Sequence, residues 1–143
     1  MKQLKALKTV IESNSPRHYG SMVQAKNNQL TYTNGFYLVR IPDSDMQDGC
    51  YTKDMIDAHI KLSQEISPLP DTYPDCDRVI PKDLSGEITV NLELLERICK
   101  ILKHDSKHKL GRLQFDIDDL DSPLKIVTEN GSLGVLVPMK ADY

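Results

Sequence analysis

Lysine and arginine side chains recur at helical spacing in two short segments of the chain, where they could bind phosphate groups. The first segment, MKQLKALKTVIE, carries Lys2, Lys5 and Lys8. The second, residues 92–112, carries Arg97, Lys100, Lys103 and Lys107. Residues three or four apart share one face of a helix, and such a basic stripe attracts a nucleic-acid backbone without reading its sequence. Sequence-independent binding of double-stranded DNA and an ordinary solvated helix face both fit this pattern.

The charge of the chain is unevenly distributed. The 143 residues have a formal net charge of −3, but residues 1–12 carry +2 and residues 92–112 carry +3, so the remainder carries −8. A hydrophobic content of 39% and three scattered cysteines without a CxxC pair are typical of a globular protein in a reducing compartment. With no apolar run of membrane-spanning length, we expect a cytoplasmic protein without membrane contact.

Other clusters of reactive residue types fit known sites poorly. A calcium loop starting at Asp116 would need glycine at position 121 and glutamate at 127, where the chain has Asp121 and Val127. His104 and His108 could face the same way as zinc ligands, but two ligands do not make a zinc site. No nucleophile motif or phosphate-binding glycine loop occurs. The sequence therefore predicts a protein that is not an enzyme, with no cofactor and no metal site.

Apolar periodicity predicts the elements that position the first stripe. LKALKTVI is a short amphipathic helix, ended by Asn14-Ser15-Pro16. Asn27-Asn28 joins the strands SMVQA and QLTYT in a hairpin, and Asn34-Gly35 turns the chain into FYLVRIP. A short helix follows near 53–65, and the proline-rich residues 68–81 predict a surface connector.

The second stripe has a similar setting. ITVN predicts a short strand, and Asn91 is a candidate N-cap for the helix LELLERICKILK. LQFDIDD and LKIVTE predict two strands, and Asn130-Gly131 turns the second into SLGVLVP.

The predicted elements around the first stripe recur around the second stripe at a fixed distance along the sequence. Asn34 to Pro42 and Asn130 to Pro138 have the same internal spacing, 96 residues apart. We therefore predict a single α+β domain over residues 1–143, a pseudo-twofold duplication of a helix plus an antiparallel β unit, with two helices packed on one face of the sheet. Residues 1–42 would form the first half, 43–87 a connector and 88–143 the second half. Chance similarity of two Asn-Gly hairpins is the alternative.

Several stretches resemble the sliding DNA clamps, in particular the bacterial DNA polymerase III beta subunit. YPDCDRVIPKD (73–83) is similar to the family's interdomain linker Phe-Pro-Asp-Tyr-Arg-Arg-Val-Leu/Ile-Pro-Lys, and TNGFYLV (33–39) to Thr-Asp-Gly-His-Arg-Leu-Ala. ITVNLELLERICKILK and the closing LVPMK resemble the clamp's last helix and its terminal Met-Pro-Met-Arg. The resemblance implies a DNA-clamp-like processivity factor for replication or repair, self-associating around duplex DNA with its basic helices facing the phosphates.

In the family, a turn, the linker and the C-terminus build an apolar pocket for short peptides of polymerases and other replication proteins. The matching positions imply a peptide-binding site made of Thr33, Gly35, Leu38, Pro81, Val137, Pro138 and Met139. Methionine suits such a site because its flexible thioether repacks around different partners. Ordinary packing of a strand that ends at a proline is the alternative.

The chain also departs from the family. Family clamps carry several domains per chain, and Phe36-Tyr37 stands where they have His-Arg. The alternative function is a single-domain decoy or regulator that binds a host clamp or clamp-binding proteins without encircling DNA. The small size suggests a phage or mobile-element protein.

Overall fold

Helices and antiparallel strands make up both parts of the chain, so the predicted α+β class is confirmed. The structure, a computed structural model, describes residues 2–13, 15–43, 45–62, 65–104 and 106–140. It divides the chain into two units, residues 1–81 (unit 1) and 82–143 (unit 2), each of which is described by itself. The prediction of one domain with halves at 1–42 and 88–143 stays a prediction. None of the helices in the described ranges is long and apolar enough to cross a membrane.

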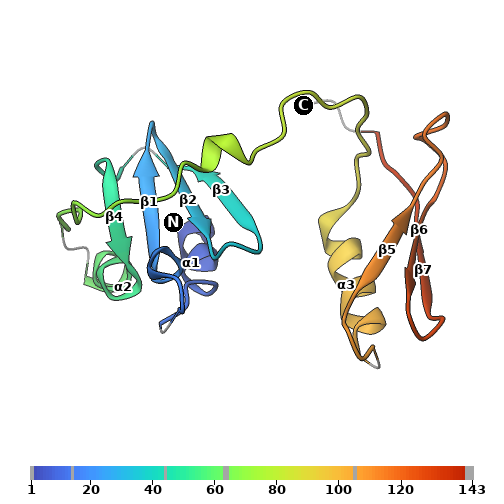
Figure 1. The fold of residues 1–143 in the computed structure, drawn as a ribbon, viewed down its shortest axis with the longest axis horizontal. Helices are drawn as coiled ribbons and strands as arrows, with labels where there is room; N and C mark the ends of the chain where they lie inside the picture. The colour runs from blue at the N-terminus through green and yellow to red at the C-terminus, as the bar shows by residue number, and fades with distance from the viewer. Residues whose placement is uncertain (1, 14, 44, 63–64, 105, 141–143) are drawn as a thin grey trace. The chain divides into compact units, whose positions relative to one another are not determined.

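Unit 1 is a four-stranded antiparallel sheet with two α-helices, in the strand order β3-β2-β1-β4 (Figure 1). Its elements are α1 (Lys2–Lys8), β1 (Met22–Lys26), β2 (Gln29–Thr33), β3 (Leu38–Pro42), β4 (Gly49–Thr52) and α2 (Lys53–Leu62), with short 3-10 helices η1 (His18–Ser21) and η2 (Cys76–Arg78). Asn27 and Asn28 have φ angles of 53° and 59°, which is the geometry that a two-residue hairpin needs. The predicted hairpin is therefore confirmed. The helix predicted near 53–65 is confirmed over Lys53–Leu62, and residues 63–64 of that prediction lie outside the described ranges.

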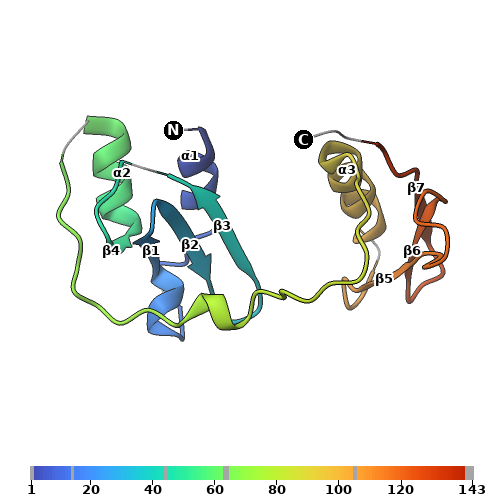
Figure 2. The same cartoon turned by 90° about the horizontal axis from the view of Figure 1, so that it is seen from above.

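The α-helices of unit 1, α1 and α2, lie on the same face of its sheet (Figure 2). Val23, Ala25, Leu30 and Tyr32 point to this face and are buried with Leu4, Leu7 and Ile11 of the first segment and with Ile56 of α2. Burial of each large apolar side chain contributes about 1.5–3 kcal/mol. This cluster fixes the side of the sheet on which α1 lies, and with it the direction of the lysines on α1.

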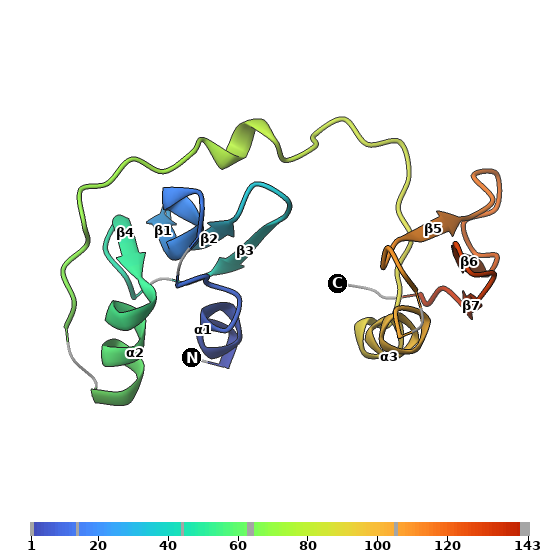
Figure 3. The same cartoon turned by 60° about the horizontal axis from the view of Figure 1, so that its bottom comes forward.

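The opposite face of the sheet is crossed by residues 69–78, which we call the strap (Figures 1 and 3). At β4, Leu69 and Cys50 exchange two backbone hydrogen bonds of 3.2 and 2.8 Å. At β1 and β2, the side chain of Tyr73 is buried with Met22 and Cys76. At β3, Asp77 forms a 2.7 Å ion pair with Arg40. The strap therefore contacts all four strands.

The interval 43–87 differs from the predicted surface connector in two respects. It contains β4, which pairs with β1 along its whole length, from Met22–Thr52 to Ala25–Gly49. The proline-rich residues form no strand beyond the bridge at Leu69, as predicted, but Tyr73 is buried. The connector thus contributes both an edge strand and the cover of the outer face.

Unit 2 is a three-stranded antiparallel sheet, β5-β6-β7, with one helix. Its elements are α3 (Leu92–Leu102), β5 (Gly111–Gln114), β6 (Leu124–Thr128) and β7 (Leu133–Leu136). The side chain of Asn91 accepts a 3.0 Å hydrogen bond from the N–H of Leu94, so the predicted N-cap is confirmed. A Cβ on Gly134 would lie 2.6 Å from Ile98, which shows how closely α3 packs on β7.

Two expectations for unit 2 are corrected. Residues 88–91 form no strand, because the carbonyl of Thr89 accepts a single hydrogen bond, from Met139, at 2.8 Å and no ladder follows. The strand predicted over 113–119 ends at Gln114, because the carboxylate of Asp116 accepts the N–H of Asp118 and begins a turn. The turn at Asn130-Gly131 is as predicted.

Candidate nucleic-acid and peptide interfaces

On α1, the three predicted DNA-binding lysines differ in their surroundings. Lys5 is exposed, whereas Lys8 is half-buried and forms an ion pair with Asp57 of α2. The hydrogen bond from Lys8 holds the pKa of the Asp57 carboxyl below its usual value. The side chain of Lys2 lies outside the described part of the structure. Of the two lysine side chains described on this helix, Lys5 is therefore the accessible one without a salt bridge.

On α3, two of the predicted DNA-binding cations have carboxylate partners one turn away. Arg97 contacts Glu93 at 2.8 Å and Lys100 contacts Glu96 at 2.9 Å. All four of these side chains are mostly exposed, and pairs of this kind contribute little free energy. Lys103 and Lys107 are also exposed, and no salt bridge to either is found among the described residues. The predicted stripe is too long, because α3 ends at Leu102 and Lys107 lies beyond it. The cations are accessible, but two of the four are neutralised.

The apolar side of α3 explains why these cations face away from the sheet. Leu102 is buried, Leu95 and Ile98 are half-buried, and Ile98 contacts Gly134 of β7. Leu94, earlier on the same helix, is 42% exposed. The helix therefore directs a narrow apolar stripe towards the sheet and the basic stripe towards solvent.

The turn between β2 and β3 holds three of the predicted peptide-binding residues. The hydroxyl of Thr33 accepts the N–H of Gly35 at 3.1 Å and donates to the carbonyl of Tyr37 at 2.8 Å. Gly35 has a φ of 91°, a conformation that favours glycine. The turn presents Phe36, 86% exposed, with the Arg17 guanidinium 5.2 Å from the centre of its ring.

The structure brings this turn together with the strap. The N–H of Thr33 donates to the Tyr73 hydroxyl at 3.0 Å, and that hydroxyl donates to the carbonyl of Met22 at 3.2 Å. Burial raises the pKa of Tyr73, so its hydroxyl stays protonated as this donor. Leu38 packs on the cluster that contains Tyr73 and Cys76. Thr33 and Leu38 are thus held beside the strap, where the stretch that resembles the clamp linker begins.

The remaining predicted peptide-binding residues lie elsewhere in the chain. Pro81 is exposed at the end of unit 1. In unit 2, Pro138 and Met139 line a hollow of about 280 Å³ with Ile88 and Leu120, while the exposed Val137 does not line it. Because the predicted pocket takes residues from both units, its assembly stays a prediction.

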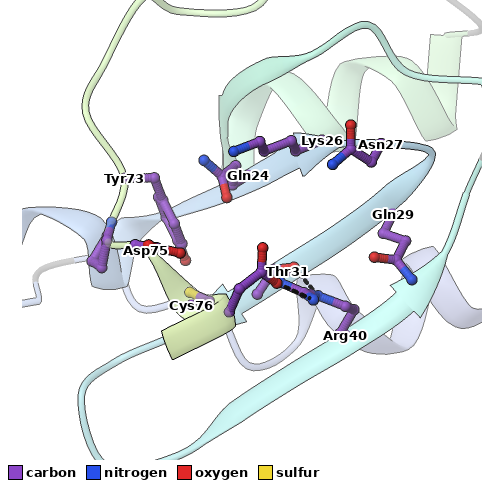
Figure 4. A pocket seen from close by; sticks show the side chains of 11 residues that line it. Gln24, Lys26, Asn27, Gln29, Thr31, Arg40, Tyr73, Asp75 and Cys76 are labelled. Carbon is purple, nitrogen blue, oxygen red and sulfur yellow. Dashed lines mark hydrogen bonds and ion pairs between the residues drawn. The ribbon is translucent and has the colours of Figure 1, made fainter. Parts of the chain in front are cut away.

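The sequence analysis missed a polar cavity of about 260 Å³ on the strap side of unit 1 (Figure 4). Side chains of β1, β2, β3 and the strap line it. Arg40 reaches across it, donating to the Thr31 hydroxyl at 2.8 Å and to the Asp77 carboxylate at 2.7 Å. The alternation of side chains along β1 places Gln24 and Lys26 on this face, and this part of the lining could be predicted from the sequence. The wall formed by the strap could not. The cavity offers amides, cations and carboxylates to a polar group.

The buried thiols of unit 1 are unsuited to nucleophilic chemistry. Burial is the largest cause that raises the pKa values of Cys50 and Cys76, so both stay protonated at neutral pH. Among the described residues, no three acidic, histidine or cysteine side chains are grouped as metal ligands.

The chain was compared with protein-family models and with curated proteins. No protein-family model and no curated protein matches the chain. The resemblance to sliding clamps therefore stays a prediction from the quoted residues.

Proposed function

We propose that the protein is a non-enzymatic, clamp-like tethering factor for DNA replication or repair, self-associating around duplex DNA and docking peptides of replication proteins. It would act in the cytoplasm. Exposed cations of α1 and α3 would contact phosphates, and the turn at 33–38 would contribute to peptide docking.

The observation that carries this proposal is the orientation of α3. Leu102 and Ile98 of this helix pack on the sheet, so Lys100, Lys103 and Arg97 face solvent. Exposed cations on a rigid helix attract a phosphate backbone by charge alone, which leaves the protein free to slide.

A shared order of elements supports the proposed duplication. In unit 1, α1 precedes the consecutive antiparallel strands β1, β2 and β3; in unit 2, α3 precedes β5, β6 and β7. Each of these helices packs apolar residues on one face of its own sheet. Two copies of one helix-plus-sheet unit would have this order.

The bond between Thr33 and Tyr73 supports the peptide-docking part. It holds the turn beside the strap, as a pocket built from turn and linker requires. Within unit 2, half-exposed Met139 lines its own hollow and would offer a peptide an adaptable apolar side chain there.

The ion pairs favour a second candidate, a regulator that binds clamp-binding proteins without DNA. Lys8, Arg97 and Lys100 each have a carboxylate partner, so fewer cations are free for phosphates. The two candidates share the peptide-docking surface and differ in the basic stripe.

Charge reversal tests the choice. The triple variant Lys5→Glu, Lys103→Glu, Lys107→Glu changes exposed cations with no salt-bridge partner among the described residues. The control, Lys26→Glu, Lys125→Glu, Lys140→Glu, makes the same change of net charge at exposed positions outside α1 and α3. We measure duplex-DNA affinity against salt concentration for both variants and the natural chain.

Under the tethering function, the first variant loses DNA binding, and its salt dependence falls by a slope of about 0.9 for each phosphate that it no longer neutralises. The control keeps most of its affinity. Equal losses of affinity in both variants would show that net charge alone causes the effect. A natural chain that does not bind DNA would contradict the tethering function and favour the regulator.

A further inference from the structure

The free edge of β5 is the clearest unpartnered surface in unit 2. β5 has one neighbour in the sheet, β6, and all four of its residues are exposed. Within the described residues, no backbone hydrogen bond to the other edge of β5 is found. An uncovered edge of this kind is a template for another strand.

The two faces of this edge differ in chemistry. Leu113 is opposite Ile126, which is opposite Gly134, and Gly134 contacts Ile98 of α3. Leu113 therefore lies on the helix side of the sheet. Phe115 follows the last residue of β5, and it would share this side in a strand that continued through residue 116. These side chains are 58% and 52% exposed. Alternation puts Arg112 and Gln114 on the other face, where Asp116 would follow in the lengthened strand.

We propose that β5, lengthened through Phe115 and Asp116, pairs antiparallel with the same segment of a second copy of this chain, in a register centred on Gln114. Gln114 then faces Gln114 of the second copy, and Leu113 faces Phe115. Arg112 faces Asp116. Each of the last two contacts occurs twice because a twofold interface uses one patch on both copies.

The sequence RLQFD makes this edge complementary to itself. Directly opposite residues of an antiparallel pair share a face, so apolar side chains meet on the helix side and opposite charges meet on the other. A shift by one residue would mix the faces. A register centred on Leu113 would put Arg112 opposite Gln114, and one centred on Phe115 would extend the pairing to Asp118, in the turn that follows β5.

This pairing makes a continuous six-stranded sheet from two copies of unit 2, with both α3 helices on one face. Two-fold charge complementarity and the matched apolar pair identify the occupant as a second copy of the same edge. The inference does not depend on DNA tethering, because it follows from β5 alone.

A disulfide at the centre of the interface tests the register. Residues that face one another across antiparallel strands have Cβ atoms about 4.5–5.5 Å apart, close to the reach of a disulfide. The variant is Gln114→Cys in a Cys99→Ser background, since Cys99 is the exposed native thiol. The control is Lys125→Cys in the same background, opposite Gln114 on β6 and one strand from the edge. Mild oxidation should cross-link the first full-length chain to itself and leave the second monomeric on a denaturing gel.

Charge exchange tests the contacts. Arg112→Asp and Asp116→Arg should each weaken self-association about tenfold or more in sedimentation equilibrium, and the double variant should restore it. Because Asp116 also accepts the N–H of Asp118, recovery in the double variant separates loss of the interface from loss of the turn. Lys125→Asp should have no effect.

Three results would overturn the proposal. The natural chain stays monomeric at high concentration, cross-linking is as strong at Lys125→Cys as at Gln114→Cys, or self-association is insensitive to both charge changes. The last result would point to another surface as the interface. In that case, DNA binding by the natural chain would leave the tethering function standing, whereas a strictly monomeric chain would also contradict the self-association that this function needs.

Discussion

The hydroxyl of Tyr73 lies 3.0 Å from the backbone nitrogen of Thr33 and accepts its N–H, so one side chain of the strap is bonded directly to the turn that carries Phe36. The same hydroxyl donates to the carbonyl of Met22. Tyr73 is 8% exposed, and a buried donor or acceptor without a partner costs about 1–3 kcal/mol. The strap is thus held on the sheet by polar contacts that a phenyl ring cannot make.

Tyr73→Phe should lower the free energy of unfolding of unit 1 by about 1–3 kcal/mol, because the Thr33 N–H loses its partner in a buried site. Urea unfolding of the full chain measures the loss, and amide exchange at Thr33 should accelerate. The control is Tyr37→Phe, on an exposed ring, with an expected change within about 0.5 kcal/mol. Equal changes in the two variants would contradict the role of the hydroxyl.

Gly35→Ala should destabilise the protein more than Gly131→Ala. Both glycines have positive φ angles, 91° and 84°, so each substitution costs about 1–2 kcal/mol of backbone strain. A Cβ at Gly35 would also lie 1.6 Å from the Arg17 guanidinium, whereas no atom lies within 4 Å at Gly131. Arg17 must then leave the Asn34 carbonyl and the Phe36 ring. Thermal unfolding compares the pair, and similar losses would show that Arg17 moves freely.

Asn91→Ala should destabilise α3 by about 0.5–2 kcal/mol, because the N–H of Leu94 loses its cap. Asn91→Asp retains an acceptor oxygen at the same place and adds a negative charge at the helix N-terminus, so its stability should be close to that of the natural chain. Chemical denaturation monitored in unit 2 tests both variants. An Asp variant as unstable as the Ala variant would argue against capping.

The stability of unit 2 should fall in acid through Glu129. Hydrogen bonds from the Ser106 hydroxyl at 2.6 Å and the His108 N–H at 3.0 Å lower the pKa of this carboxyl from 4.5 to about 2. A depressed pKa gives stability that is present above pH 4.5 and is lost as the pH falls towards 2. Glu129→Gln should flatten this part of the pH–stability curve. An unchanged curve, or a Glu129 that titrates near 4.5 by NMR, would refute the contact.

Turns and caps were readable from the sequence because their causes are local. Asn27-Asn28 and Gly35 adopt positive φ angles that most residues avoid, and Asn91 caps a helix whose apolar spacing begins one residue later. The strands β1, β2, β3, β6 and β7 follow from the turns that flank them.

The elements that the sequence did not reveal depend on distant partners. β4 is a short strand without alternation, and it exists because Tyr51 and Cys50 pair with Val23 and Gln24 of β1. Residues 88–91 have strand-like composition, but a strand needs a ladder. Among the described residues, the one backbone hydrogen bond that joins them to a distant segment runs from Met139 to Thr89.

The predicted basic stripes show the same limit. Spacing correctly indicated which cations of α3 share a solvent-facing side, but the pairing of Lys8 with Asp57 joins residues that are 49 positions apart. The prolines of the strap indicated an extended segment correctly, yet the burial of Tyr73 depends on a sheet face that no local pattern describes.

The order of the strap's anchors determines how unit 1 would yield to a pull on its C-terminal end. Tension applied beyond residue 81 first reaches the Asp77–Arg40 pair, then the Tyr73 hydroxyl, and last the Leu69–Cys50 bridge. Because these anchors lie in sequence across the strands, they would rupture one after another at low force, as in peeling. The helix-side cluster of Val23, Leu30 and Ile56 would feel no strain until the whole strap had come away.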